Sequence, residues 1–270
     1  GRTRIVGGGK TYLAVQSAEK ISHVITLTAN GPAGHAAVPL PGNAIFRLAR
    51  AVARISGHVE PLVLTPITRR FFANLAAIWP DEAEAAAMKM LADADAARRE
   101  EGAEILSKTA VFNAVLRNGI SATLLTGGIR YNVIPATAGA GFNVRTLPGE
   151  KLEDVIGRLR VVISDPEIAI EITQRGEEAP DSDPDSEMFT AITESVKALR
   201  PEIAVVPYLS TGVTDSARLR RLGVKAYGIL PFPMVQGDEE RMHGHDERVP
   251  VDSLHFGTRL IYEATLRVAR

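Results

Sequence analysis

The sequence has no cysteine among its 270 residues and only one tryptophan, and what it lacks excludes several classes of protein. Without cysteine it has neither disulfides nor thiolate zinc ligands, so a bound metal must be held by His, Asp or Glu. No apolar run approaches the roughly 20 residues that span a bilayer, and no secretory signal is visible. A net charge of −1 argues against nucleic-acid binding. We therefore expect a cytoplasmic protein with neither membrane nor nucleic-acid partners.

Apolar residues make up 45% of the sequence, which is enough for the core of one large domain or two ordinary ones. The sequence opens with Gly1-Arg2-Thr3-Arg4, which is typical of neither a signal nor a natural start. We expect the chain to begin inside a longer ancestral sequence.

The apolar spacing of residues 19–176 predicts the element order β-α-β-β-α-β. Strands are expected at 21–29, 120–126, 132–145 and 168–173, and helices at 43–57 and from 148 onwards. This is the order of a ferredoxin-like split unit, an antiparallel four-stranded sheet with two helices on one face. A helical insertion at about 58–119 interrupts it, and the alanine- and charge-rich composition of residues 81–99 within it predicts a solvated helical segment.

A polar, proline-containing stretch at 177–184 suits a domain boundary, and helices and strands alternate beyond it. Helices are expected at 188–199, 217–222 and 251–268, and strands at 203–206 and 224–230, with a further strand at 11–16. This alternation is half of an α/β layered domain. The sequence therefore predicts an α/β protein with a partial three-layer αβα domain and a ferredoxin-like α+β domain.

Residues 243–247 place two imidazoles and two carboxylates in a segment rich in glycine and proline. Neutral imidazole with nearby carboxylates is the usual ligand set of a hydrolytic zinc site. His243 is the first candidate ligand, with Asp246, Glu247 and Arg248 as groups that could orient its ring, and His245 is an alternative. A loop histidine of this kind can equally be an ordinary surface residue.

Three further side chains are candidates for contact with a substrate. His35, in a turn of small residues after a strand, could donate to a developing oxyanion, or could be a solvent-exposed turn residue. Asn132, before an X-Pro break, and Arg145, at a strand end, suit carboxylate recognition, because arginine offers a bidentate fork and asparagine an amide donor. A salt bridge at a strand edge is the alternative for this pair.

Gly212 and Thr214 lie in a turn leading into a helix, where backbone amides can hold an anionic substrate group. The alternative is an ordinary capping motif with Thr214 or Asp215 as the N-cap. A metal-independent hydrolase would need a nucleophile, and the sequence has no Gly-x-Ser-x-Gly elbow. The candidates for such a site are Ser210, Ser216, Asp215 and His243.

Taken together, these segments resemble the dinuclear zinc amidohydrolases, a family that includes carboxypeptidase S, glutamate carboxypeptidase, aminoacylase, acetylornithine deacetylase and succinyl-diaminopimelate desuccinylase. The resemblance is nearest to carboxypeptidase S and its N-acyl-amino-acid hydrolase relatives. Five stretches carry it in the family's order, namely 31–39, 122–135, 143–149, 212–215 and 243–249.

The resemblance implies a zinc enzyme that hydrolyses the amide bond of N-acyl amino acids or short peptides with a free carboxylate, using two zinc ions in full-length relatives. It implies that residues 19–176 form a lid and dimerisation domain that pairs two copies into a homodimer. Residues 1–18 and 177–270 would then be parts of the catalytic domain.

The resemblance also implies a role for each candidate side chain. His243 looks like the last zinc ligand, and His35 like the lid histidine that reaches across the dimer and stabilises the tetrahedral intermediate. Asn132 and Arg145 look like the residues that bind the substrate carboxylate or its oxyanion. The loop that lines the substrate would contain Gly212 and Thr214.

The sequence departs from the family pattern at its start, because the family's other zinc ligands, bridging Asp and Glu general base precede the segment where Gly1 stands. One imidazole cannot hold a catalytic zinc ion, which usually needs three protein ligands and water. We therefore expect an incomplete hydrolase that is inactive as this chain alone. The alternatives are a non-catalytic dimerisation or scaffold fragment, and the metal-independent esterase-like hydrolase.

Overall fold

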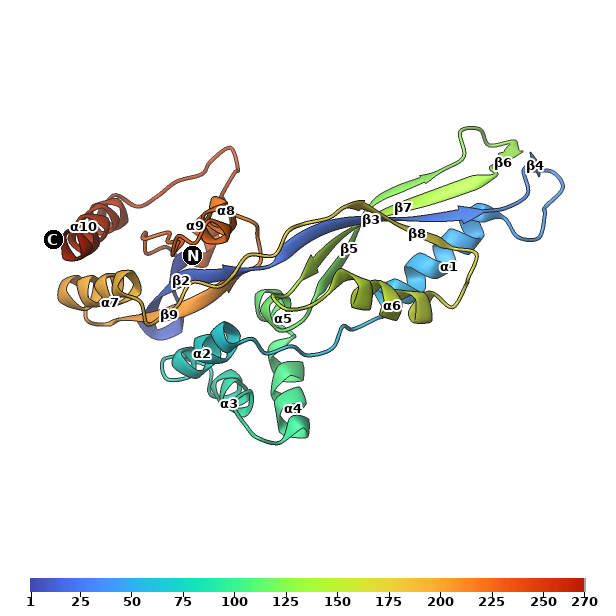
Figure 1. Ribbon diagram of the computed structural model, residues 1–270. Coiled ribbons are helices and arrows are strands. Elements are labelled where there is room, and N and C mark those ends of the chain that lie inside the picture. The colour runs from blue at the N-terminus through green and yellow to red at the C-terminus, as the bar shows by residue number, and fades with distance from the viewer. Residues whose placement is uncertain (270) are drawn as a thin grey trace. The chain divides into compact units, whose positions relative to one another are not determined.

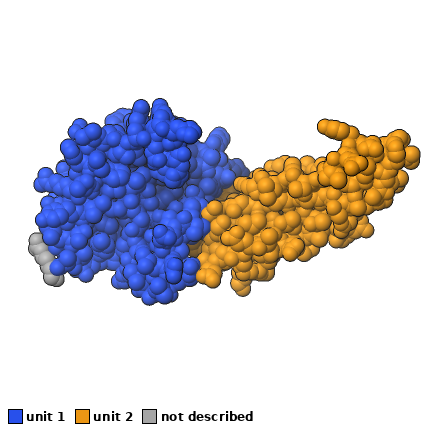
Figure 2. Space-filling model, turned by 90° about the horizontal axis from the view of Figure 1, so that it is seen from above, with its two compact units in different colours: residues 1–20, 62–116, 179–270 blue, residues 21–61, 117–178 orange. Residues whose placement is uncertain are grey.

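The computed structural model describes residues 1–269, and these form two compact units (Figure 2). Each unit has its own sheet and its own hydrophobic core. Unit 1 comprises residues 1–20, 62–116 and 179–269, and unit 2 comprises residues 21–61 and 117–178.

Unit 2 is a four-stranded antiparallel sheet with the strand order β5-β7-β3-β8. Helices α1 and α6 lie on one face of this sheet (Figure 1). The bounds are β3 (Ile21–Asn30), α1 (Ala44–Ser56), β5 (Gly119–Gly127), β7 (Thr137–Thr146), α6 (Leu152–Ile163) and β8 (Ala169–Gln174). The predicted ferredoxin-like order is confirmed.

The core of unit 2 lies between the sheet and its two helices, because each element buries one side. On β3, Ile25 and Leu27 are fully buried, whereas Thr26 between them is only half-buried. Leu48 of α1 and Leu159 of α6 pack into the same core. The core of unit 2 therefore lies on one face of the sheet.

A short strand pair extends one end of this sheet. It consists of β4 (Gly34–His35) and β6 (Val133–Ile134), which run antiparallel. The N–H of Gly31 donates to the carbonyl of Ala136 at 2.9 Å, which joins the pair to the ends of β3 and β7. The turn that carries His35 is thus tied to a rigid sheet.

Unit 1 contains a three-stranded sheet of order β1-β2-β9, in which β2 runs antiparallel to β1 and parallel to β9. Helices α7 and α10 pack on one face around Leu13 and Leu260. On the other face, Phe71 of α2 contacts Tyr208 with 5.5 Å between ring centroids. This layering is the predicted partial αβα domain. The bounds are β1 (Arg2–Ile5), β2 (Thr11–Glu19), β9 (Ile203–Ser210), α7 (Glu187–Leu199) and α10 (Val251–Val268).

The helical insertion expected at 58–119 is a set of separate helices, and residues 62–116 belong to unit 1. Asp81 is the N-cap of α3, and its side chain accepts the N–H of Glu84 at 2.8 Å. No helix within residues 1–269 has the length and apolarity needed to cross a bilayer. The remaining bounds are α2 (Pro66–Leu75), α3 (Glu82–Met90), α4 (Ala96–Leu106), α5 (Ala110–Leu116), α8 (Asp215–Arg221), α9 (Gln236–Glu239) and a 3₁₀ turn (Gly7–Gly9).

The strand expected at 224–230 is wrong. Only Gly228 forms a bridge there, through backbone hydrogen bonds to Gln16 of 2.8 and 3.1 Å. Strand β1 already pairs with β2 from Thr11 to Ala14 along the edge where a strand at 224–230 would have to pair. Only the last residues of β2 remain available for pairing with that segment. Pro231 and Pro233 follow at once and have no N–H to donate to a ladder.

His23 of β3 is buried as a neutral imidazole. Its Nδ1 accepts the N–H of Gly176 at 3.0 Å, and its Nε2 lies 3.2 Å from the hydroxyl of Thr146. Burial, with a smaller contribution from the nearby Arg175 guanidinium, lowers the pKa of His23 below its ordinary 6.5. The folded state therefore resists taking up a proton that the unfolded chain accepts.

We expect the free energy of unfolding to fall as the pH drops below 6.5, the ordinary value for His23. Below that pH the unfolded chain binds a proton before the native state does, so stability rises with pH by at most about 1.4 kcal/mol per pH unit per histidine. Urea unfolding at pH 7.5 and 5.5 measures the difference. The variant His23→Gln should lose this contribution, and an identical pH dependence in the two proteins would contradict the assignment.

Candidate functional site

His35 is exposed on β4, opposite Val133 of β6. Its ring Nδ1 accepts a hydrogen bond from the backbone N–H of Ala37 at 3.0 Å. A neutral imidazole whose Nδ1 is an acceptor carries its proton on Nε2. Within residues 1–269 that Nε2–H has no partner, so it remains a donor of the kind that an oxyanion needs.

Asn132 lies beside the His35 turn, because its carbonyl accepts the N–H of Ala36 at 3.1 Å. Its side chain is exposed, and no hydrogen bond to that amide occurs in the described part of the chain. The short strand pair thus brings together two candidates that are far apart in sequence. Both side chains are exposed near this end of unit 2's sheet.

Arg145 lies on β7 between Ser22 of β3 and Gly119 of β5. Its Nε donates to the Oδ1 of Asn143 at 2.8 Å. Its Nη1 is buried and, within residues 1–269, has no hydrogen-bond partner. Buried donors are normally satisfied, so this guanidinium has capacity left for an anionic ligand.

His35 and Arg145 of one chain lie at opposite ends of the same sheet. The His35 strand pair adjoins Thr137 at the start of β7, and Arg145 is near the end of that strand. Eight residues at about 3.4 Å each separate Thr137 from Arg145 by roughly 27 Å. One copy of unit 2 therefore cannot bring both side chains to neighbouring groups of a small substrate.

The loop containing Gly212 and Thr214 connects β9 to α8 in unit 1. The N–H of Gly212 donates to the hydroxyl of Ser210 at 3.3 Å. Thr214 stands at the N-cap position of α8 but makes no side-chain capping hydrogen bond. Its hydroxyl donates instead to Oε2 of Glu19 at 2.7 Å, a contact that the sequence did not indicate.

His243 lies in the exposed loop between α9 and α10, with a left-handed φ of 65°. Its backbone N–H donates to Oε2 of Glu247 at 3.0 Å, and Asp246 forms an ion pair with Arg241. Both carboxylates thus hold the turn itself. Within residues 1–269 neither of them contacts the His243 ring, contrary to the orienting role expected for them.

The described residues do not fit a zinc ion on their own. Across residues 1–269, no three side chains of the His, Cys, Asp and Glu types come together as a metal site. His243 therefore supplies at most one ligand, and a catalytic zinc usually needs three.

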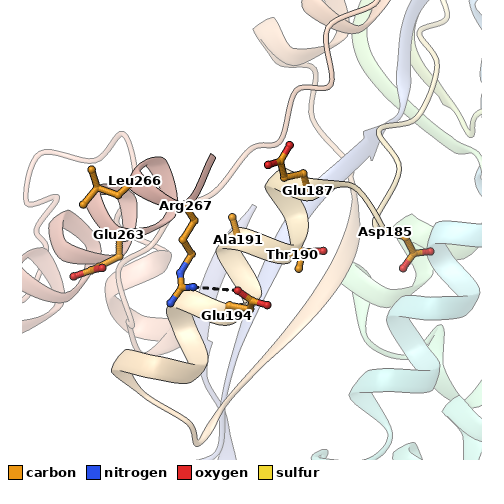
Figure 3. Close-up of a pocket in the computed structure, with 8 residues that line it drawn as sticks. All are labelled: Asp185, Glu187, Thr190, Ala191, Glu194, Glu263, Leu266 and Arg267. Atoms are coloured by element: carbon orange, nitrogen blue, oxygen red, sulfur yellow. Dashed lines mark hydrogen bonds and ion pairs between the residues drawn. The ribbon is translucent and has the colours of Figure 1, made fainter. Parts of the chain in front are cut away.

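Unit 1 also contains a hollow between α7 and α10 (Figure 3). Its walls are acidic, with Glu187 and Glu194 from α7 and Glu263 from α10. Arg267 crosses it to Glu194 at 3.1 Å, as the dashed line in Figure 3 shows. None of the six candidate residues contributes to its lining.

Comparison with known proteins assigns the chain to a family. A family model described as the M20 peptidase dimerisation domain matches residues 18–170, which is more than half of the chain. The chain belongs to the M20 peptidase family. The matched segment contains the whole of β3 and the short strand pair with His35, together with Arg145.

Relatives of this M20 chain are named as amide hydrolases and carboxypeptidases. The human N-fatty-acyl-amino acid synthase/hydrolase PM20D1 is 24% identical over 260 residues, covering 94% of this chain and 50% of that protein. A probable carboxypeptidase S-like protein of Dictyostelium discoideum is 29% identical over 148 residues, covering 54% of this chain and 28% of that protein. The chain thus spans half or less of the length of these relatives.

A solved structure shares the fold of the M20 chain. Human carnosine dipeptidase 1 superposes with a TM-score of 0.60 at 16% sequence identity, covering 96% of this chain and 57% of that one. At this identity the likeness concerns the fold alone. It confirms the mixed helix and sheet architecture derived above.

Proposed function

We propose that this chain forms the substrate-binding part of an amide hydrolase that acts on N-acyl amino acids or short peptides with a free carboxylate. The observation that carries this proposal is that two hydrogen-bond donors, Nη1 of Arg145 and Nε2–H of His35, have no acceptor within residues 1–269. A guanidinium suits a carboxylate, and an imidazole N–H suits the oxyanion of an attacked amide. Membership of the M20 family supports the reaction class.

We propose further that two copies share the site through unit 2. In an N-acyl amino acid the amide carbonyl and the carboxylate are three covalent bonds apart. His35 adjoins Thr137 at the start of β7, which is roughly 27 Å along the strand from Arg145, so the two side chains can serve one substrate only from different copies. The matched dimerisation domain supports such a pairing.

The edge of unit 2's sheet supplies a surface for this pairing. Strand β5 lies at the edge, with Leu125 on it 69% exposed. An apolar groove runs beside it between α1 and the strand, lined among others by Ile45, Leu48 and Val52. An exposed apolar edge strand is a template for a second chain, and a two-fold axis lets the same surface meet itself.

His243 is our proposed zinc ligand, and it can act only together with ligands from outside residues 1–269. The described chain is therefore expected to bind the substrate carboxylate without metal-dependent turnover.

This is tested by calorimetric titration with N-acetyl-L-leucine and with N-acetyl-L-leucinamide, which lacks the carboxylate. We expect the acid to bind roughly 10- to 150-fold more tightly than the amide, because a hydrogen-bonded charge contributes about 1.5–3 kcal/mol. We expect no zinc-dependent hydrolysis of either compound by the chain alone. Turnover that EDTA abolishes would contradict the incomplete metal site. Equal or absent binding of the two compounds would contradict carboxylate recognition and favour a non-catalytic dimerisation fragment.

A further inference from the structure

Glu19, the last residue of β2, is buried, and its carboxylate accepts hydrogen bonds from four donors. Two come from Thr214, whose backbone N–H reaches Oε1 at 2.9 Å and whose hydroxyl reaches Oε2 at 2.7 Å. The others come from Nε2 of Gln16 at 2.8 Å and Nη2 of Arg220 at 3.0 Å, both to Oε2. One side chain thus ties the end of β2 to both the start and the end of α8.

This arrangement is poorly suited to stabilising the fold. Nε and Nη1 of Arg220 are buried and, within residues 1–269, have no hydrogen-bond partner. A buried ion pair with unsatisfied donors adds little net stability, because desolvation offsets the attraction between the charges. Such a pair does hold the groups that it contacts in one conformation, and here it holds the loop 210–214.

The loop that Glu19 holds is accessible to a ligand. A Cβ built on Gly212 would meet only the hydroxyl oxygen of Ser210 within 4 Å, at 3.9 Å, so the backbone there borders open space. Val213 is also exposed, at 55%. Thr214, in contrast, has both its hydroxyl and its N–H committed to Glu19. The loop therefore has one anchored end and one open stretch of backbone.

We infer that Glu19 is a positioning residue, whose carboxylate holds Thr214 so that the Gly212 backbone faces the substrate. The inference rests on the proposed function and on the family resemblance, which implies that the loop containing Gly212 and Thr214 lines the substrate. This inference changes the role expected for Thr214. The threonine hydroxyl anchors the loop, and the exposed backbone at Gly212 and Val213 contacts the substrate. Arg220 and Gln16 keep the carboxylate in place.

The test is hydrogen exchange of the loop amides in Glu19→Gln, compared with the wild-type chain. An amide in place of the carboxylate turns one acceptor oxygen into a donor that faces other donors. We expect the amides of residues 212–214 to exchange roughly tenfold faster or more. Glu60→Gln is the matched control, since Glu60 in unit 2 is also buried and accepts from Arg158 and Asn118. It should leave loop exchange unchanged.

Two substitutions of Thr214 separate anchoring by the hydroxyl from simple packing. Thr214→Ser keeps the donor and loses a methyl group, whereas Thr214→Val keeps the shape and loses the donor. Anchoring predicts fast loop exchange and weakened binding of N-acetyl-L-leucine in the valine variant, and near wild-type values in the serine variant. This pair decides the question even if Glu19→Gln fails to fold.

The inference is overturned if a folded Glu19→Gln protein shows unchanged exchange at residues 212–214, or if valine at 214 behaves like serine. A wild-type chain that binds no N-acetyl-L-leucine would instead contradict the proposed function. The exchange comparison would still decide whether Glu19 anchors the loop, so the two failures are distinguishable.

Discussion

Replacing Leu125 by aspartate is expected to turn the proposed dimer into monomers. Leu125 is 69% exposed on the edge strand β5 and lines the apolar groove beside α1. Burying a carboxylate there without a partner costs about 2 kcal/mol or more, and two-fold symmetry counts that cost twice. The dissociation constant should therefore rise roughly a thousandfold. Sedimentation equilibrium measures the change from a mass of about twice 29.0 kDa to 29.0 kDa.

A matched control distinguishes this surface from any exposed leucine. Leu222, at the end of α8 in unit 1, is 73% exposed. Leu222→Asp adds the same charge at a site of similar exposure and should leave the dimer intact. Equal dissociation in both variants, or a Leu125→Asp protein that stays dimeric, would contradict pairing through β5.

Replacing Arg145 by methionine is expected to weaken binding of N-acetyl-L-leucine roughly 30- to 150-fold, from the loss of about 2–3 kcal/mol of charge-assisted hydrogen bonding. Methionine keeps much of the length of the side chain and removes all of its donors. The remaining affinity should equal that for N-acetyl-L-leucinamide. Calorimetric titration of both compounds against wild type and variant provides the comparison.

Two further substitutions define what Arg145 contributes. Arg145→Lys keeps the charge and loses the bidentate fork, so an intermediate affinity is expected. Arg160→Met removes an exposed guanidinium from α6 in the same unit and should leave binding unchanged. If all three variants bind the acid equally well, Arg145 does not hold the carboxylate.

Local patterns in the sequence predicted most elements of the fold, because their causes are local. The helical spacing of Leu48, Val52 and Ile55 follows from burial of one side of α1, and alternation along β3 follows from burial of one face. The strand expected at 224–230 failed because its pairing depends on which part of β2 is left unpaired by β1. Such competition between strands is not encoded in a window of sequence.

The sequence indicated which residues are candidates for the site, but it did not indicate which of them lie close together in space. His35 and Asn132 meet only because β4 pairs with β6, and Thr214 meets Glu19 only because β9 runs beside β2. Glu19 gave no signal, since a single glutamate at a strand end resembles an ordinary surface residue. The unsatisfied Nη1 of Arg145 depends on side-chain packing, which the sequence alone does not specify.

The absence of cysteine allows one direct measurement of the shared site, because a single introduced cysteine is a unique point of attachment. A nitroxide label on Ser121→Cys, at an exposed position of the edge strand β5, reports whether two copies meet there. Pairing through β5 predicts a dipolar coupling between two labels with one defined distance, and its loss in the Leu125→Asp background. A coupling no stronger than the background of dispersed monomers, at concentrations where the wild-type chain should be paired, would contradict a site shared between two copies.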